Sequence, residues 1–135
     1  MLANPIFNMT RILLVDDEPG FTAALMINLE ETGKFTVDVV NDPRNALRKA
    51  LEFKPEVILL DVVMPGLDGG DVLTLFRSEK QLLDTPVILV TAMVDPTKTA
   101  AGLGVVEEAG QIMIAKPVQM DVLLQVIENS LGRPV

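Results

Sequence analysis

The sequence contains no cysteine, no histidine, no tryptophan and no tyrosine. The absence of cysteine and histidine excludes disulfides, thiolate nucleophiles, imidazole bases and every zinc site built on those ligands. Basic residues are also scarce: 11 Lys and Arg stand against 19 Asp and Glu, giving a net charge of −8. A chain this acidic is poorly suited to bind a phosphate backbone or an anionic membrane, so we expect no direct nucleic acid or membrane partner.

Long apolar runs are absent as well. The strongest apolar stretch, from Val57 to Met64, is interrupted by Asp61 and followed by Pro65, so it is far shorter than the roughly 20 residues of a membrane helix. The opening residues MLANPIFN lack the basic segment of an export signal. We therefore expect a cytoplasmic protein.

Length and composition indicate a single domain. The 135 residues are 49% hydrophobic and 22% charged, which is typical of globular proteins rather than disordered ones. We expect an N-terminal extension over residues 1–10, one domain over residues 11–132 and a C-terminal tail over residues 133–135. No internal repeat or linker interrupts the chain.

Short apolar runs alternate with longer amphipathic segments from end to end, which is typical of an α/β fold with a parallel sheet. The runs are rich in Ile, Val and Leu, as expected for strands covered on both faces, and they occupy residues 12–15, 35–40, 57–60, 87–90 and 112–115. Asp and Pro residues suited to helix starts follow the first four runs. We predict five helices, beginning near Pro19, Asp42, Asp68, Asp95 and Gln119.

Polar side chains come at the carboxyl ends of four of the predicted strands. Taken singly, each would be an ordinary loop residue or helix cap. In an open parallel sheet, however, this edge is where ligands bind, so together the residues predict one site. They are Asp16, Asp17 and Glu18 after the first strand, Asp61 after the third, Thr91 after the fourth and Lys116 after the fifth.

The carboxylates of this group require a cation if all are ionised. Two carboxylates about 4 Å apart repel by roughly 4 kcal/mol at an effective dielectric constant of about 20. Oxygen ligands without His or Cys favour Mg²⁺, with Mn²⁺ as a substitute. A metal ion, a lysine and a hydroxyl around a carboxylate would suit phosphoryl transfer, in which the carboxylate itself can be the acceptor.

These motifs, in this order, resemble a response-regulator receiver domain. The resemblance covers Arg11 to Leu131 and implies a flavodoxin-like, doubly wound sheet of five parallel strands in the order 2-1-3-4-5. The matching residues are Asp16 and Asp17, Asp61 followed by MPGLDG, Thr91 with Ala92, and Lys116 with Pro117. The resemblance implies these roles: Asp61 as phosphoryl acceptor, Asp16 and Asp17 as the Mg²⁺ pair acting with Asp61, Thr91 as a hydroxyl that moves toward the phosphoryl group, and Lys116 as its counter-charge.

The resemblance also implies partners. The phosphoryl donor would be a phosphohistidine on a sensor histidine kinase or a histidine phosphotransfer protein, and phosphorylation would switch the conformation and alter partner binding. The domain would phosphorylate and dephosphorylate itself with Mg²⁺ but would not be a dedicated turnover enzyme. A phosphorylation-dependent homodimer is left open.

The output stays undetermined. Only four residues follow Leu131, so we expect no output domain in this chain. A stand-alone signalling protein, a phosphorelay intermediate and a receiver from a longer regulator are all compatible with the sequence. A Mg²⁺-dependent phosphatase is an alternative, although such enzymes usually carry Asp-x-Asp, whereas Asp16 and Asp17 are adjacent. The intact set of site residues disfavours an interaction module that is never phosphorylated. Flavin binding is disfavoured because no phosphate-binding loop follows the first strand.

Several positions depart from the family pattern or bear on its mechanism. Met113 stands where the family commonly has an aromatic residue, so the family's coupling of the hydroxyl to an aromatic rotamer does not carry over to this sequence. Gly102 and Gly104 weaken the helix expected after Asp95. The resemblance implies that Val63 and Met93, two residues after Asp61 and Thr91, flank the approach of water to the acceptor. Neither side chain can hydrogen-bond a water strongly, so we expect slow self-dephosphorylation.

Two further expectations concern the ends of the first and last strands. Glu18 could orient a metal-bound water or simply begin the first helix, and the sequence favours neither. The peptide bond between Lys116 and Pro117 should be cis, as the resemblance suggests, because that turn would aim the lysine toward the acceptor.

Overall fold

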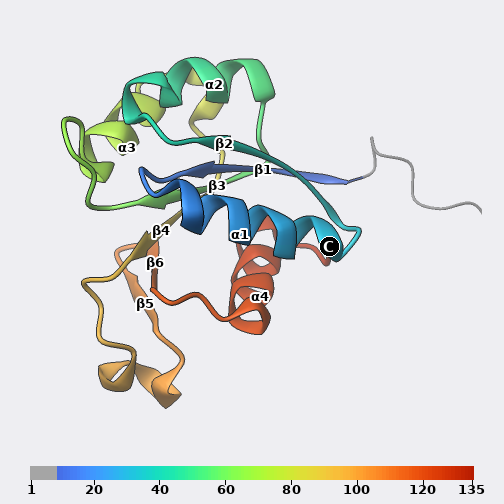
Figure 1. The fold of residues 1–135 in the computed structure, drawn as a ribbon, viewed down its shortest axis with the longest axis vertical. Helices are drawn as coiled ribbons and strands as arrows, with labels where there is room; N and C mark the ends of the chain where they lie inside the picture. Colours follow the sequence, from blue (N-terminus) through green and yellow to red (C-terminus); the bar gives the residue numbers. More distant parts are fainter. Residues whose placement is uncertain (1–8) are drawn as a thin grey trace, which may run out of the picture.

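A computed structural model describes residues 9–135 of the chain and shows, over these residues, a six-stranded sheet with helices on both faces (Figure 1). The strands are β1 (Thr10–Val15), β2 (Phe35–Val40), β3 (Val57–Asp61), β4 (Val87–Thr91), β5 (Val105–Glu108) and β6 (Gln111–Ala115). The α-helices are α1 (Pro19–Glu31), α2 (Ala46–Phe53), α3 (Gly69–Arg77) and α4 (Met120–Leu131).

The sheet order is β2-β1-β3-β4-β6-β5, and every pairing except the last is parallel. Helices α1 and α4 cover one face, and α2 and α3 cover the other (Figure 1). Because successive side chains of a strand point to opposite faces, Ile12 and Leu14 join the core under α1 and α4, whereas Leu13 and Val15 join the core under α2 and α3. Two buried faces explain why the central strands β1, β3 and β4 each contain a continuous apolar run.

The predicted flavodoxin-like fold is confirmed, since the five predicted strands are β1, β2, β3, β4 and β6 and they lie in the predicted order 2-1-3-4-5. Three helix boundaries, two of them predicted starts, follow local chemistry. Pro19 begins α1, and Gly33, with a φ of 73°, follows its C-terminal end in the left-handed conformation that glycine tolerates. The Asp68 side chain caps α3 by accepting a hydrogen bond from the Asp71 N–H at 3.0 Å.

The helix predicted after Asp95 is wrong. The chain instead forms two short 3₁₀ turns, over Pro96–Lys98 and Ala100–Gly102, and then β5, which pairs antiparallel with β6. Residues 101, 102 and 104 have φ values of 55°, 66° and 75°, and a run of left-handed residues cannot continue a right-handed helix. Residues 9–135 therefore contain four α-helices rather than five, and a sixth strand at the sheet edge.

Within the described residues, none of the helices combines the length and the apolar character needed to cross a bilayer. The cytoplasmic location stays a prediction, as do the domain boundaries at residues 10 and 132. Most of the expected N-terminal extension, residues 1–8, lies outside the described part of the chain.

Candidate functional site

The strand register brings four strand ends together at one edge of the sheet. Val15 pairs with Leu60, so Asp16 and Asp61 follow directly on neighbouring strands. On the next pair of strands, Thr91 lies opposite Ala115, and Lys116 follows at once. The predicted site residues therefore lie at the same carboxyl edge.

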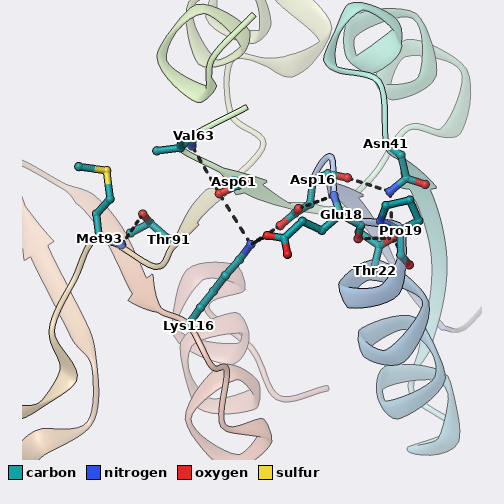
Figure 2. A network of polar contacts seen from close by, with 10 residues as sticks. All are labelled: Asp16, Glu18, Pro19, Thr22, Asn41, Asp61, Val63, Thr91, Met93 and Lys116. Atoms are coloured by element: carbon teal, nitrogen blue, oxygen red, sulfur yellow. Dashed lines mark hydrogen bonds and ion pairs between the residues drawn. The ribbon is translucent and has the colours of Figure 1, made fainter. Parts of the chain in front are cut away.

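The loop after β1 is fixed by hydrogen bonds to Asp16. Its Oδ1 atom accepts from the Glu18 N–H at 3.0 Å, which turns the chain toward α1. Nδ2 of Asn41, at the end of β2, donates to the Asp16 carbonyl at 2.8 Å and to Oγ1 of Thr22 at 3.0 Å (Figure 2). Asn41 could not be identified from the sequence, because its role depends on β2 lying beside β1.

Four carboxylates converge at this edge. Asp16, Asp17, Glu18 and Asp61 each place a carboxylate oxygen within 4.8 Å of the others. Asp16 and Asp61 are 3% and 5% exposed, so water screens their charges poorly. The cluster therefore carries an excess of negative charge that is partly shielded from solvent.

The cost of burying several negative charges together is seen in the pKa of Asp61. Burial, together with the charge of Asp16, raises the pKa of Asp61 from 3.8 to about 6, although Lys116 and a hydrogen bond from the Val63 N–H act in the opposite direction. The Val63 N–H lies 3.4 Å from Oδ1 of Asp61. Most Asp61 side chains are still ionised at neutral pH.

Lys116 supplies the positive charge that partly balances this cluster. Its Nζ atom lies 2.7 Å from Oδ2 of Asp16 and 3.1 Å from Oε1 of Glu18. Oδ1 of Asp61 is farther away, at 3.9 Å (Figure 2). Burial alone would lower the pKa of Lys116, but the hydrogen bonds to Asp16 and Glu18 outweigh it and raise the pKa. The expected cis peptide bond between Lys116 and Pro117 is present.

Thr91 lies on the side of Asp61 opposite Asp16, because β3 lies between β1 and β4 in the sheet. Its side chain is buried, and its Oγ1 atom accepts a hydrogen bond from the Met93 N–H at 3.0 Å (Figure 2). A surface cleft of about 330 Å³ is lined by Asp61, Thr91 and Lys116 together with Glu18, Val63, Ala92 and Met93. Val63 and Met93 are 57% and 76% exposed, so apolar side chains form part of the rim.

The loop after β3 lies close against Asp61. The Gly69 N–H donates to the Val62 carbonyl at 2.9 Å, and a side chain at position 69 would collide with the Asp61 backbone. Gly66 has a φ of 86°, which glycine adopts easily. Met64 is buried in the core, as expected for a packing residue. These residues shape the loop and position the acidic side chain.

The donor set fits a hard divalent cation. Asp16, Asp17 and Asp61 offer carboxylate oxygens, as predicted, and Glu18 adds another. Mg²⁺ prefers such oxygen ligands. A bound cation would offset both the burial of the Asp61 charge and its repulsion from Asp16, which together raise the pKa of Asp61. The Glu18 carboxylate accepts a hydrogen bond from Lys116. The two roles considered for Glu18 from the sequence, orienting a metal-bound water and beginning the first helix, did not include this contact.

Known proteins similar to this chain include a family of signalling domains and several regulators. Residues 12–128 match the family model described as the response regulator receiver domain. The DNA-binding response regulator MtrA of Mycolicibacterium smegmatis is 32% identical over 123 residues, covering 91% of this chain and 51% of MtrA. The chain thus spans about half the length of the curated relatives it matches.

Solved structures with the same fold include a chemotaxis protein and the receiver domain of a sensor kinase. The chemotaxis protein CheY4 of Vibrio cholerae has a TM-score of 0.75 and 27% identity, covering 91% of this chain and 99% of that one. The receiver domain of a sensor histidine kinase from Pseudomonas aeruginosa has a TM-score of 0.74 and 25% identity, covering 92% and 98% of the two chains. The latter structure holds a magnesium ion in its active-site cleft.

Proposed function

The chain belongs to the response regulator receiver domain family and is a phosphoacceptor module of two-component signalling, and from that premise we propose that Asp61 is the residue that accepts the phosphoryl group. The observation that carries this assignment is the position of Asp61. It is the buried carboxylate that lines the same cleft as Thr91 and Lys116.

The proposed donor is a phosphohistidine on a sensor histidine kinase or a histidine phosphotransfer protein. A carboxylate oxygen of Asp61 forms a bond to phosphorus while the bond between phosphorus and the donor imidazole nitrogen breaks, and the imidazole keeps that electron pair. The reaction needs ionised Asp61, and a pKa of about 6 leaves most molecules in that form at neutral pH.

Asp16, Asp17 and Asp61 would hold Mg²⁺, or Mn²⁺ in its place. When bound, the ion supplies positive charge that stabilises the oxygens of the transferring phosphoryl group. Lys116 contributes a second positive charge, with its Nζ atom 3.9 Å from Oδ1 of Asp61. Asp16 therefore has two alternative roles, as partner of Lys116 and as metal ligand.

The switch proposed for this chain begins at Thr91. Its hydroxyl holds the Met93 N–H in the unphosphorylated geometry, so movement toward a phosphoryl group would pull on the loop after β4. The segment that follows includes β5 rather than a helix, and a changed conformation there would alter partner binding. Self-dephosphorylation by water would return the domain to its resting state.

Mass spectrometry after incubation with acetyl phosphate and Mg²⁺ tests the assignment. We expect one phosphoryl group on the wild type, located at Asp61, and none on Asp61→Asn. Asp17→Asn should retain the acceptor but require a higher Mg²⁺ concentration, because a ligand charge is lost. Asp121→Asn, an exposed carboxylate on α4, is the matched control and should label normally. Equal labelling of Asp61→Asn and the wild type would contradict the proposal.

A further inference from the structure

An aromatic ring lies beside the site lysine. Phe21, in the first turn of α1, places its ring centroid 4.3 Å from Nζ of Lys116. Glu18, the residue before α1, precedes Phe21 by three positions. Glu18 accepts a hydrogen bond from the same ammonium at 3.1 Å.

The Lys116 ammonium is therefore held by two carboxylates and an aromatic face. Its side chain is 12% exposed, so this contact is largely shielded from water. Phe21 also lines two cavities: the small one beneath Asp16 and Asp61, and the surface groove beside Lys116. Phe21 and Lys116 both line the surface groove, whereas Phe21 but not Lys116 lines the small cavity.

We propose that Phe21 is a positioning residue for Lys116, with its aromatic face holding the ammonium at the phosphorylation cleft. The proposal rests on the proposed function of Asp61 and Lys116. An aromatic face attracts a cation through its quadrupole, and the attraction grows when the pair is desolvated. A further carboxylate would also attract Lys116, but it would add to the repulsion among Asp16, Asp17 and Asp61. Phe21 attracts the lysine without adding negative charge.

Fluorinated phenylalanine at position 21 tests this role, because fluorine withdraws charge from the ring face with little change of shape. We expect the rate constant for Asp61 labelling by acetyl phosphate in Mg²⁺ to fall stepwise from phenylalanine to the pentafluoro analogue. A total loss of roughly three- to tenfold corresponds to a cation–π contact of this kind. Phe21→Leu should show a similar loss, and Phe21→Tyr should restore the rate. The control is pentafluorophenylalanine at Phe53, which lies on α2 and should leave the rate unchanged.

NMR of the metal-free protein provides a second measurement that does not depend on phosphorylation. The ring should shift the Lys116 Cε protons upfield, and Phe21→Leu should abolish that shift. If the wild type shows the shift but is not labelled at Asp61, the assignment of the acceptor fails and the ring contact stands. A labelling rate that is unchanged by fluorination, or a Lys116 shift that is unchanged in Phe21→Leu, would overturn the positioning role.

Discussion

The two ends of the sheet carry opposite electrostatic arrangements. At the amino end, Glu56 accepts from Nη2 of Arg133 at 2.6 Å and lies 3.4 Å from Nη1 of Arg11, so one acid has two basic partners. At the carboxyl end, four carboxylates converge around Lys116. At the amino end the charges are partly exposed and balanced by partners of opposite sign. At the carboxyl end two of the four carboxylates, Asp16 and Asp61, are buried, and negative charge is in excess.

This difference separates a structural ion-pair network from a functional one. Partly exposed pairs such as those of Glu56 each contribute little, and the protein gains modest stability from them. The carboxyl end costs stability without a divalent ion, and the cost is visible in the raised pKa of Asp61. Excess charge of this kind is retained where a ligand of opposite charge has to bind. The following changes test that contrast.

Replacing Lys116 should have the largest effect. Lys116→Met leaves the nearly buried Asp16 carboxylate without its 2.7 Å partner, and loss of one member of a buried pair costs about 3 kcal/mol. Urea unfolding at pH 7 without divalent ions measures this loss. The matched control is Lys49→Met, which breaks a more exposed pair with Asp38 and should cost less than about 1 kcal/mol. Equal losses in the two variants would contradict the proposed difference between buried and exposed pairs.

Replacing Asp61 should stabilise the metal-free protein. The rise of its pKa from 3.8 to about 6 corresponds to a penalty of at most roughly 3 kcal/mol, so Asp61→Asn should gain about 2 kcal/mol at pH 7. Between pH 4 and 6 the folded state binds the extra proton, so wild-type stability falls as pH rises through this window and levels off above it.

Urea unfolding across pH checks both parts of that prediction. The stability of Asp61→Asn should lack the decline that Asp61 causes between pH 4 and 6, and Mg²⁺ should narrow the gap between variant and wild type by stabilising the wild type. A variant less stable than the wild type at pH 7 without metal would show that Asp61 is not electrostatically strained.

At the amino end we expect a smaller effect, a loss of stability where Asp61→Asn gives a gain. Glu56→Gln removes the charge shared by Arg11 and Arg133, whose side chains are 42% and 46% exposed, so the loss should be about 1 kcal/mol. The loss should shrink in high salt because exposed pairs are screened. Adding Mg²⁺ should not change it, and a Mg²⁺-dependent loss would link the two ends of the sheet.

The sequence predicted the parallel core because the central strands β1, β3 and β4 are buried on both faces, which leaves continuous apolar runs that are easy to recognise. It failed at β5, where Val105 and Val106 form a run of four residues with two exposed glutamates. The pairing that makes this segment a strand, such as Glu107 opposite Ile112, is a tertiary contact with no local signal. Gly102 and Gly104 weakened the helix prediction but did not indicate what would replace the helix.

The site, like the fold, has parts that local sequence predicts and parts that only tertiary contacts determine. Asp16, Asp61, Thr91 and Lys116 could be placed at one edge because each follows a recognisable strand. Their partners could not be predicted, since the contact between Lys116 and Asp16 joins residues 100 positions apart. Phe21 and Asn41 were missed for the same reason: their contacts exist only once α1, β2 and β6 are assembled.

The smallest effect concerns the apolar rim at the carboxyl end. Val63 and Met93 line the cleft beside Asp61, are largely exposed and offer no hydrogen bond from their side chains to an incoming water. Replacing them by Val63→Asn and Met93→Glu together should therefore speed the loss of the phosphoryl group by roughly three- to fivefold. This is well below the 10²- to 10⁴-fold effect of a true general base, because the new groups would only bias where water sits.

Phosphoryl loss from the purified phosphoprotein in Mg²⁺ buffer gives the rate. Leu83→Asn is the control, since Leu83 is 51% exposed but is not among the residues that line the cleft, and its decay should match the wild type. Faster decay in the double variant alone would mean that the apolar rim prolongs the phosphorylated state while the acidic cluster beneath it binds the ion. Unchanged or slower decay would show that water reaches the acyl phosphate by a path that these two side chains do not control.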